Sequence, residues 1–297
     1  MAIRESKSRK VFTVFNVIIL IIITLACILP FIHLLAISLS SEVYTTAGEV
    51  GLLPKGFSTE AYKFLLEKPD FFRAMGVSIK RVVLGTTITM FLVVLTAYPL
   101  SKESDRFKGR TAYVWFFAFT MFFGGGLIPT YMVIKNLKLV NTIWALVLPG
   151  AISVFNVVML LNFFRRIPKE LEEAAIMDGA SELTILFKIF LPVSLPSLAT
   201  LTLFTAIGHW NSWFDGIMYI NDPAMYPLQT YLSTIVLDSN NTTLQVMTPE
   251  QLKRMEDIGQ QNLTAAQIFL GALPIMVVYP FLQRYFVKGL VVGSVKG

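Results

Sequence analysis

Long apolar stretches separated by short polar segments dominate the chain. A helix that crosses a bilayer needs about 20 consecutive, mostly apolar residues, and six stretches meet this requirement. No region alternates between apolar and polar residues strongly enough for a membrane barrel. The pattern therefore predicts an all-α membrane protein with six transmembrane helices, at about 11–39, 82–100, 111–134, 139–164, 189–214 and 263–283.

The composition supports a membrane protein. Of the 297 residues, 55% are hydrophobic and only 15% are charged, whereas about 25% of the residues in a soluble domain are charged. The single cysteine, Cys27, lies within the first apolar stretch, so a disulfide framework is excluded. That stretch is also far longer than the roughly 7–15-residue core of a secretory signal peptide. Basic residues at span ends explain the net charge of +6, so we do not expect nucleic acid as a partner.

The distribution of basic residues predicts the orientation. Most of the 25 Lys and Arg residues lie in short segments before the first span and after the second, fourth and sixth spans. Because short cytoplasmic segments are enriched in Lys and Arg, we expect both termini and the segment 165–188 in the cytoplasm. The loops at about 40–81, 135–138 and 215–262 are then expected outside. The chain 1–297 is treated as one transmembrane domain.

The segment 165–188 has the signals of a helical hairpin. Pro168 suits the first turn of a helix, and the glutamates that follow it favour the positive end of the helix dipole. Gly179 fits a left-handed helix end, and Ser181 is suited to cap a second helix. We therefore expect a short helix, a glycine turn and a second helix leading into the fifth span.

One face of the first hairpin helix carries small side chains next to acidic ones. Leu171, Ala174, Ala175 and Asp178 share this face at helical spacing, and a backbone of another protein can approach small side chains closely. The residues alone leave two interpretations open with equal weight. The face is a docking surface for a partner, or the hairpin is a solvated loop with good helix propensity.

The hairpin resembles the EAA motif of ABC importer permeases. The motif positions match in identity and spacing at Glu173-Ala174-Ala175, Gly179, Ile189 and Leu191-Pro192. The resemblance implies a type I ABC importer permease fold with a cytoplasmic coupling helix that sits in a cleft of an ATPase subunit. It implies that the residues coupled to the ATPase are Glu172, Glu173, Ala174, Ala175, Asp178 and Gly179.

Two further segments resemble the carbohydrate-uptake branch of these importers. The C-terminal segment Gln283–Gly297 is similar to the end of a maltose-importer permease, whose tail reaches between the ATPase subunits, so Lys296 and Gly297 are expected to contact the ATPases. The segment WNSWFDGIMYI (residues 210–220) resembles the Trp-Asn region of carbohydrate permeases. Within this branch the chain looks most like permeases for complex or acidic oligosaccharides, such as alginate or rhamnogalacturonan fragments.

The resemblance also implies partners and a location. The chain has no Gly-x4-Gly-Lys-Ser/Thr phosphate loop, so it is expected to bind no cofactor itself, and ATP and Mg are expected in partner subunits. The implied assembly contains two ATP-binding-cassette ATPase subunits, a second permease chain and an extracytoplasmic solute-binding protein. It would import an oligosaccharide across the bacterial plasma (inner) membrane by alternating access, with lipid around this multi-pass chain.

Candidates for the substrate path are aromatic and polar residues in or near the spans. Sugar sites combine aromatic faces with amide or carboxylate hydrogen bonds, and polar groups within a span often face a cavity. Interfacial anchoring remains the alternative for the tryptophans, and it is equally open for Asn211 and Asp215. Lys80 and Arg81 are expected to snorkel to the lipid headgroups. The substrate-path candidates are Asn211, Asp215, Trp210, Trp213, Asn156 and Tyr131.

Three other functions compete with this one. An importer permease for a polyamine, peptide or anion would carry the same motif, so this alternative stays open. An intramembrane enzyme would need paired catalytic groups, but the chain has two His, one Cys and no His-Glu-x-x-His motif. A secondary transporter would show an inverted repeat and coupling charges at mid-membrane, and neither is visible. We therefore expect a transport subunit with no catalytic and no metal site.

Overall fold

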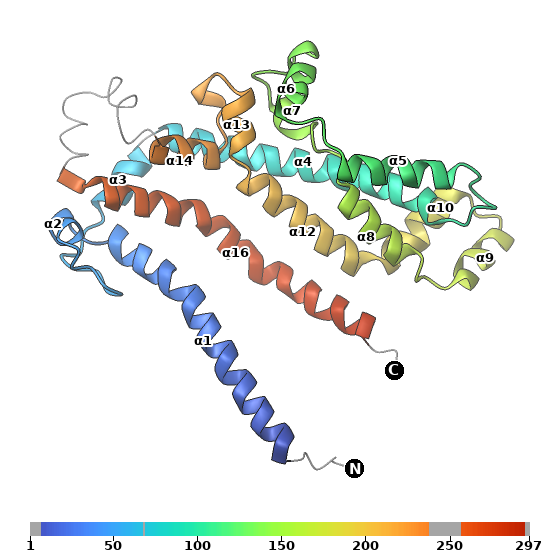
Figure 1. Cartoon of the computed structure of the whole chain (residues 1–297), viewed down its shortest axis with the longest axis horizontal. Helices are drawn as coiled ribbons and strands as arrows, with labels where there is room; N and C mark the ends of the chain where they lie inside the picture. Colours follow the sequence, from blue (N-terminus) through green and yellow to red (C-terminus); the bar gives the residue numbers. More distant parts are fainter. Residues whose placement is uncertain (1–6, 68, 238–256, 295–297) are drawn as a thin grey trace. The chain divides into compact units, whose positions relative to one another are not determined.

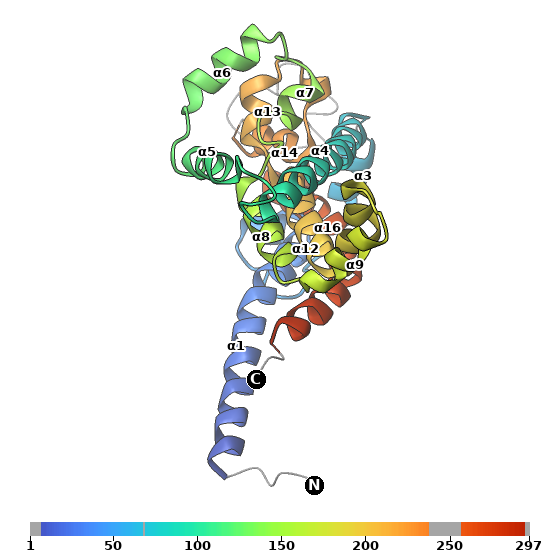
Figure 2. The same cartoon turned by 90° about the vertical axis from the view of Figure 1, so that its right-hand side faces the viewer.

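The computed structural model describes residues 7–67, 69–237 and 257–294, and this part of the chain consists of helices and connecting turns without strands (Figures 1 and 2). The helices form two compact units. The first comprises Met1–Pro69 and Thr234–Leu273, and the second comprises Asp70–Ser233 and Pro274–Gly297. The expected all-α architecture is confirmed.

The first unit joins the N-terminal part of the chain to the segment that begins α16. It contains α1 (Lys7–Ser38), α2 (Glu42–Thr46), α3 (Glu60–Glu67) and the beginning of α16 (Gln260–Ser294). The Asn262 side-chain amide of α16 donates hydrogen bonds to the carbonyls of Ile37, at 3.1 Å, and Ser40, at 2.6 Å. These bonds fasten the start of α16 to the end of α1.

The second unit carries the candidate site, and its core is formed where helices from several parts of the chain meet. The aromatic rings of Tyr98, Phe164 and Phe190 pack edge to face, with centroid distances of 5.1 to 6.3 Å. Leu160, Leu186 and Leu201 complete the buried cluster. The helices of this unit are α4 (Pro69–Ser101), α5 (Arg110–Phe122), α6 (Leu127–Asn136), α7 (Ile143–Val147), α8 (Val154–Phe164), α9 (Lys169–Met177), α10 (Glu182–Ile185), α11 (Leu191–Val193), α12 (Leu195–Asn211) and α13 (Phe214–Tyr219), together with the first part of α14 (Leu228–Leu237) and the later part of α16.

Two described helices are long and apolar enough to cross a membrane, α1 and α4. Two further candidates are pairs of consecutive helices with a sharp bend between them, and each pair is long and apolar enough to cross a membrane if its two helices form one span. The first pair is α5 with α6, bent by 114°, and the second is Glu182–Val193 with α12, bent by 82°. The expected spans at 11–39 and 82–100 thus correspond to single long helices, and those at 111–134 and 189–214 to bent ones.

Two expected spans are interrupted, because glycine and proline end their helices. The stretch 111–134 breaks at 123–126, where Gly126 adopts a φ of +81° that other residues rarely reach. The stretch 139–164 contains α7 and α8 on either side of Pro149-Gly150. With 11 residues, α8 is shorter than a complete span requires. Neither stretch is therefore one uninterrupted helix.

The segments predicted as external loops also contain helices. α4 begins at Pro69, within the expected loop 40–81, and α13 and α14 lie within the expected loop 215–262. These helices contain buried residues, which gives them a tertiary environment that a search for long apolar stretches does not detect. Residues 238–256 of the second loop lie outside the described residues, as do Lys296 and Gly297.

Candidate functional site

The predicted helical hairpin is present at α9 and α10. After α9, the backbone N–H of Gly179 donates to the carbonyl of Ile176, and that of Ala180 donates to the carbonyl of Ala175, both at 2.9 Å. Gly179 has a φ of +75°, as its place at the helix end predicts. The hydroxyl of Ser181 accepts from the N–H of Thr184 and caps α10. The local sequence signals thus account for the backbone of the hairpin.

A buried lysine holds the inner side of the hairpin. Nζ of Lys102, directly after α4, lies 2.8 Å from Oε1 of Glu172 on α9. The Lys102 and Glu172 side chains are only 9% and 14% exposed. The same ammonium lies 4.1 Å from the ring centroid of Tyr98 and 4.4 Å from that of Phe190. Aromatic faces attract a cation within about 6 Å, and more strongly when it is desolvated, so this lysine is stabilised from two directions.

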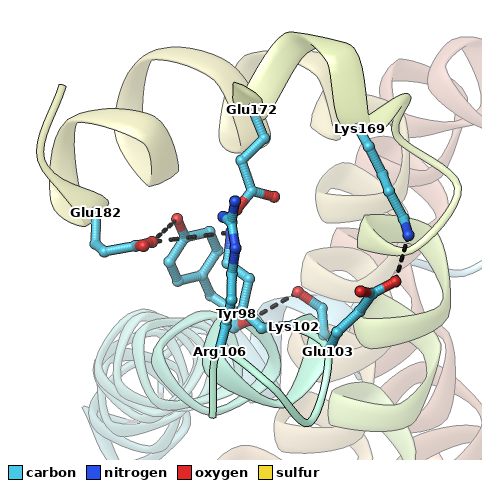
Figure 3. A network of polar contacts seen from close by, with 8 residues as sticks. Tyr98, Lys102, Glu103, Arg106, Lys169, Glu172 and Glu182 are labelled. Carbon is cyan, nitrogen blue, oxygen red and sulfur yellow. Dashed lines mark hydrogen bonds and ion pairs between the residues drawn. The ribbon is translucent and has the colours of Figure 1, made fainter. Parts of the chain in front are cut away.

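The second hairpin helix is held by the same part of α4. The Tyr98 hydroxyl donates a 2.6 Å hydrogen bond to Oε2 of Glu182 on α10, and Lys102 lies 3.8 Å from that carboxylate. Figure 3 shows Tyr98 and Lys102 between Glu172 on one side and Glu182 on the other. The end of α4 therefore bonds to both helices of the hairpin.

Two more ion pairs connect the loop after α4 with α9. Arg106 pairs with Glu172, and Lys169 pairs with Glu103 (Figure 3). The hydrogen bond between Lys169 and Glu103 lowers the pKa of Glu103 and raises that of Lys169. Both members of this second pair are well exposed, and exposed pairs contribute little to stability. The buried contact of Lys102 is therefore the principal electrostatic link.

The outer side of the hairpin has no such contacts with the rest of the unit. Glu173, Ala174, Asp178 and Gly179 are exposed, and Met177 at the end of α9 is 87% exposed. The face predicted for Leu171, Ala174, Ala175 and Asp178 is divided, because Ala175 packs against the buried aromatic cluster.

The motif residues thus fall into two groups. Glu172 and Ala175 contact the rest of the chain, and Glu173 lines the cleft between α9 and the loop after α4, whereas Ala174, Asp178 and Gly179 are exposed.

The substrate-path candidate Asp215 is an ion-pair partner of Arg81. The guanidinium of Arg81 on α4 contacts both carboxylate oxygens of Asp215 and donates to the carbonyl of Ser212 at 3.0 Å. The hydroxyl of Ser212 and the backbone N–H of Gly216 also donate to Asp215, both at 2.9 Å. The Arg81 side chain is only 3% exposed. Its expected snorkelling to lipid headgroups was wrong, because a carboxylate inside the protein pairs with it.

The other substrate-path candidates occupy different environments. Trp210 is buried, whereas Asn211 and Trp213 are exposed beside the junction between α12 and α13. Asn156 is buried on α8, and its amide donates to the hydroxyl of Thr205 on α12 at 3.0 Å.

Tyr131 on α6 stacks on Tyr219, with ring centroids 6.3 Å apart. Trp210, Asn211, Trp213 and Asp215 are near neighbours along the chain at the α12–α13 junction, whereas Asn156 and Tyr131 lie on other helices.

Sequence reasoning missed Asn141, which joins the connection after α6 to the segment after α13. Its backbone N–H donates to the carbonyl of Tyr219 at 2.7 Å, and its side-chain oxygen accepts from the N–H groups of Asn221 and Asp222 at 3.1 Å. Asn141 has a φ of +63°. Asn141 lies inside the expected span 139–164, and its residue type was the available signal, since asparagine adopts left-handed backbone more readily than most residues.

Comparisons with known proteins agree with this architecture. The family described as "Binding-protein-dependent transport system inner membrane component" matches residues 81–292. Protein LplC of Bacillus subtilis (strain 168) is 41% identical over 99% of this chain and 97% of its own length. The polygalacturonan/rhamnogalacturonan transport system permease protein YtcP of the same organism is 40% identical, over 94% of this chain and 96% of its own.

A solved structure is also similar to the chain. It is a chain of a bacterial ABC transporter involved in the import of the acidic polysaccharide alginate. The TM-score is 0.86 and the sequence identity is 32%, over 96% of this chain and 100% of the solved one.

Proposed function

The chain belongs to the family of binding-protein-dependent transport system inner membrane components, and on this premise we propose that it is the permease subunit of an ABC importer for oligosaccharides. Its relatives are ABC transport subunits and not enzymes. In the proposed assembly it works with a second permease chain, two ATPase subunits and an extracytoplasmic solute-binding protein. The complex would move its cargo inward by alternating access.

The proposal that the chain couples to an ATPase rests on the exposed side of the α9–α10 hairpin. Glu173, Ala174 and Asp178 are exposed, while Glu172 and Lys102 hold the hairpin in place from behind. A helix fixed on one side and exposed on the other is suited to enter a cleft of an ATPase subunit. ATP and Mg would be bound in that subunit.

The proposed cargo is an oligosaccharide. YtcP is named for the transport of polygalacturonan and rhamnogalacturonan, and the similar solved transporter imports alginate. These names favour an acidic oligosaccharide over the polyamine, peptide or anion alternative. Asn211 and Trp213, exposed beside the α12–α13 junction, offer an amide and an aromatic face of the kinds that bind sugars.

The proposed orientation places both termini and the hairpin in the cytoplasm of a bacterial cell. A cleft of about 550 Å³ between the α4–α5 loop and α9 supports this, because cations predominate among its charged residues. Arg81 lies 21 positions before Lys102, which corresponds to about 30 Å along a helix, close to the thickness of a bilayer core. The α12–α13 junction would then face the outside. Lys296 and Gly297 would extend toward the ATPases.

ATPase coupling in the reconstituted complex tests the proposal. The chain is co-expressed with its partner subunits, and ATP hydrolysis and uptake of alginate and polygalacturonan oligosaccharides are measured. Glu173→Arg reverses a charge on the exposed face, and Gly179→Leu strains the turn. We expect each variant to remain in the membrane but to lower transport-coupled hydrolysis about thirtyfold or more, because the loss of an interface hot spot costs about 2 kcal/mol or more.

Asp105→Arg provides the matched control, since Asp105 is exposed in the α4–α5 loop, outside the hairpin. It is expected to leave hydrolysis within about twofold of wild type, as for a typical surface substitution. Normal coupling in both hairpin variants would refute docking through α9. Uptake of neither oligosaccharide by an otherwise coupled complex would refute the proposed cargo.

A further inference from the structure

α4 bonds to the hairpin at one end and to the α12–α13 junction further along its length. We propose that α4 is a rigid connecting helix that transmits movement of the hairpin to this junction, with Lys102 and Arg81 as the positioning residues. The inference rests on the proposed function, because the hairpin movement would come from the ATPase. It adds the route by which that movement reaches the part of the chain proposed to meet the cargo.

The contacts of Lys102 make the hairpin and the end of α4 move together. This lysine is ion-paired with Glu172 on α9 and lies near Glu182 on α10, while Tyr98 also bonds to Glu182. A displacement of the hairpin alone would leave a buried ammonium without its carboxylate, which is strongly unfavourable. Displacement of the hairpin together with α4 preserves these contacts.

Three contacts join the earlier part of α4 to the segments around the junction. The N–H of Leu228, which starts α14, donates to the buried hydroxyl of Ser78 at 2.7 Å. Arg81 holds Asp215 of α13 and the carbonyl of Ser212.

Gly85 completes the set against α12. A Cβ atom built on it would lie 2.5 Å from the ring of His209, so the backbone of α4 packs directly on this side chain.

Between these contacts α4 is one continuous helix with a buried face. Val93 and Ala97 are fully buried in the core of the unit. The proline inside the helix, Pro99, lies in its last turn. Coupling between distant sites is carried by rigid elements and packed side chains, and about 30 Å of helix separates Arg81 from Lys102. α4 therefore has the length and the end contacts that a connecting helix needs.

A labelling experiment on the assembled complex tests the inference without a cargo. Cys27 is replaced by serine, and Asn211→Cys introduces a reporter at the junction. The rate of maleimide labelling is measured without nucleotide and with ATP and vanadate, which trap the ATPases. We expect this rate to respond to ATP and vanadate in the parent protein. Arg81→Met and Lys102→Met should each reduce the response about fivefold or more, the low end of typical coupling between sites.

Matched controls distinguish the effect of the two contact positions from the effect of removing any positive charge from this region. Arg73→Met removes a cation from α4 whose ion pair with Asp70 is exposed, and Lys108→Met removes an exposed lysine from the loop that contains Lys102. Both should leave the response within about twofold of the parent. Equal losses in the controls and in the two test variants would overturn the inference, as would a parent protein whose labelling ignores ATP and vanadate.

The double variant gives the sharpest result. Effects of substitutions more than about 10 Å apart normally add in free energy, so independent roles would multiply the two losses. If Arg81 and Lys102 act through α4, the double variant should lose no more than the worse single variant. Multiplied losses would overturn the inference. If a methionine variant does not assemble, Tyr98→Phe and Ser78→Ala each remove one hydrogen bond at the corresponding end, and the same comparison decides.

A comparison of Glu173→Arg with the α4 variants distinguishes a failure of the proposed function from a failure of the connecting role of α4. Glu173 is exposed at the cleft beside α9, and it is not among the partners of Lys102 and Tyr98. If this variant keeps normal ATPase coupling while the α4 variants lose their response, docking through α9 is wrong. If it loses coupling while the α4 variants respond as the controls do, only the connecting role of α4 is wrong.

Discussion

Arg81 and Asp215 form an ion pair inside the second unit, although 134 positions separate them in the sequence. The pair fastens the start of α13 to α4. Because removal of one partner leaves a buried charge uncompensated, we expect Arg81→Met to lower the free energy of unfolding by about 3–5 kcal/mol. Thermal unfolding of the detergent-solubilised protein measures the loss. Arg81→Met combined with Asp215→Asn should recover a large part of it, and a double variant as unstable as the single one would contradict this explanation.

Gly216 is required by the close approach of α13 to Thr230. A Cβ atom at Gly216 would lie 2.0 Å from Oγ1 of Thr230, which itself donates to the carbonyl of Trp213. We expect Gly216→Ala to destabilise the protein by about 1–3 kcal/mol, the usual cost of overpacking. Gly208→Ala is the control, since open space surrounds that position in α12. Its melting temperature should be equal to or above that of wild type.

Gly179 is required by its backbone conformation and not by packing. Its φ is +75°, and nothing lies within 4 Å of an added Cβ. Gly179→Ala should therefore cost roughly 1–2 kcal/mol through backbone strain, and Gly179→Asn should cost less. Limited proteolysis of the hairpin compares the two variants. Equal cleavage of both variants and wild type would show that the turn tolerates any residue.

The Glu103–Lys169 ion pair should contribute to the stability of the fold over a wide pH range. The pKa of Glu103 is lowered and that of Lys169 is raised by their hydrogen bond. The contribution of the pair is therefore lost as pH falls through the lowered pKa of Glu103, or as pH rises through the raised pKa of Lys169. Melting temperatures of wild type and Lys169→Met should differ by a constant small amount at neutral pH and converge in strong acid. A difference that grows on acidification would contradict the assignment.

Asn141 has two separable properties, its left-handed backbone and its side-chain acceptor. Asn141→Gly keeps the backbone conformation but leaves the N–H groups of Asn221 and Asp222 without this acceptor. Asn141→Asp keeps an acceptor. Loss of a buried hydrogen-bond partner costs about 1–3 kcal/mol, and exposed groups lose less. Hydrogen exchange should therefore accelerate at these two amides in Asn141→Gly and not in Asn141→Asp.

The structural features that could be predicted from the sequence are those that depend on residues close together along the chain. The turn at Gly179 and the cap at Ser181 depend on side chains a few positions away, so the hairpin could be anticipated in detail. The long-range partners could not, because nothing near Arg81 or Lys102 indicates which carboxylate each one meets. The division of the motif into an inner and an outer side also depends on Lys102, which precedes Glu172 by 70 positions.

The interrupted spans show a second reason for incomplete prediction. Three consecutive glycines and Pro129 indicate that the stretch 111–134 is weak as a helix, but the direction and size of its bend depend on the helices around it. Average hydropathy treats such a stretch as one span. It equally overlooks a short buried helix such as α13, whose six residues are too few to register.

The hydrogen bonds around the Asp215 carboxylate distinguish Asp215, whose substitution would disturb the fold, from its neighbours Asn211 and Trp213, whose substitution would not. Four donor groups already use its oxygens, so a sugar hydroxyl would have to displace one of them. Asn211 and Trp213 are exposed and carry no comparable structural duty for their side chains. A family that acquires new cargoes can therefore vary these two positions while keeping the fold intact. If Asn211 and Trp213 contact the cargo as proposed, they are the positions to randomise in the design of importers with altered selectivity, and Asp215 is the one to leave unchanged.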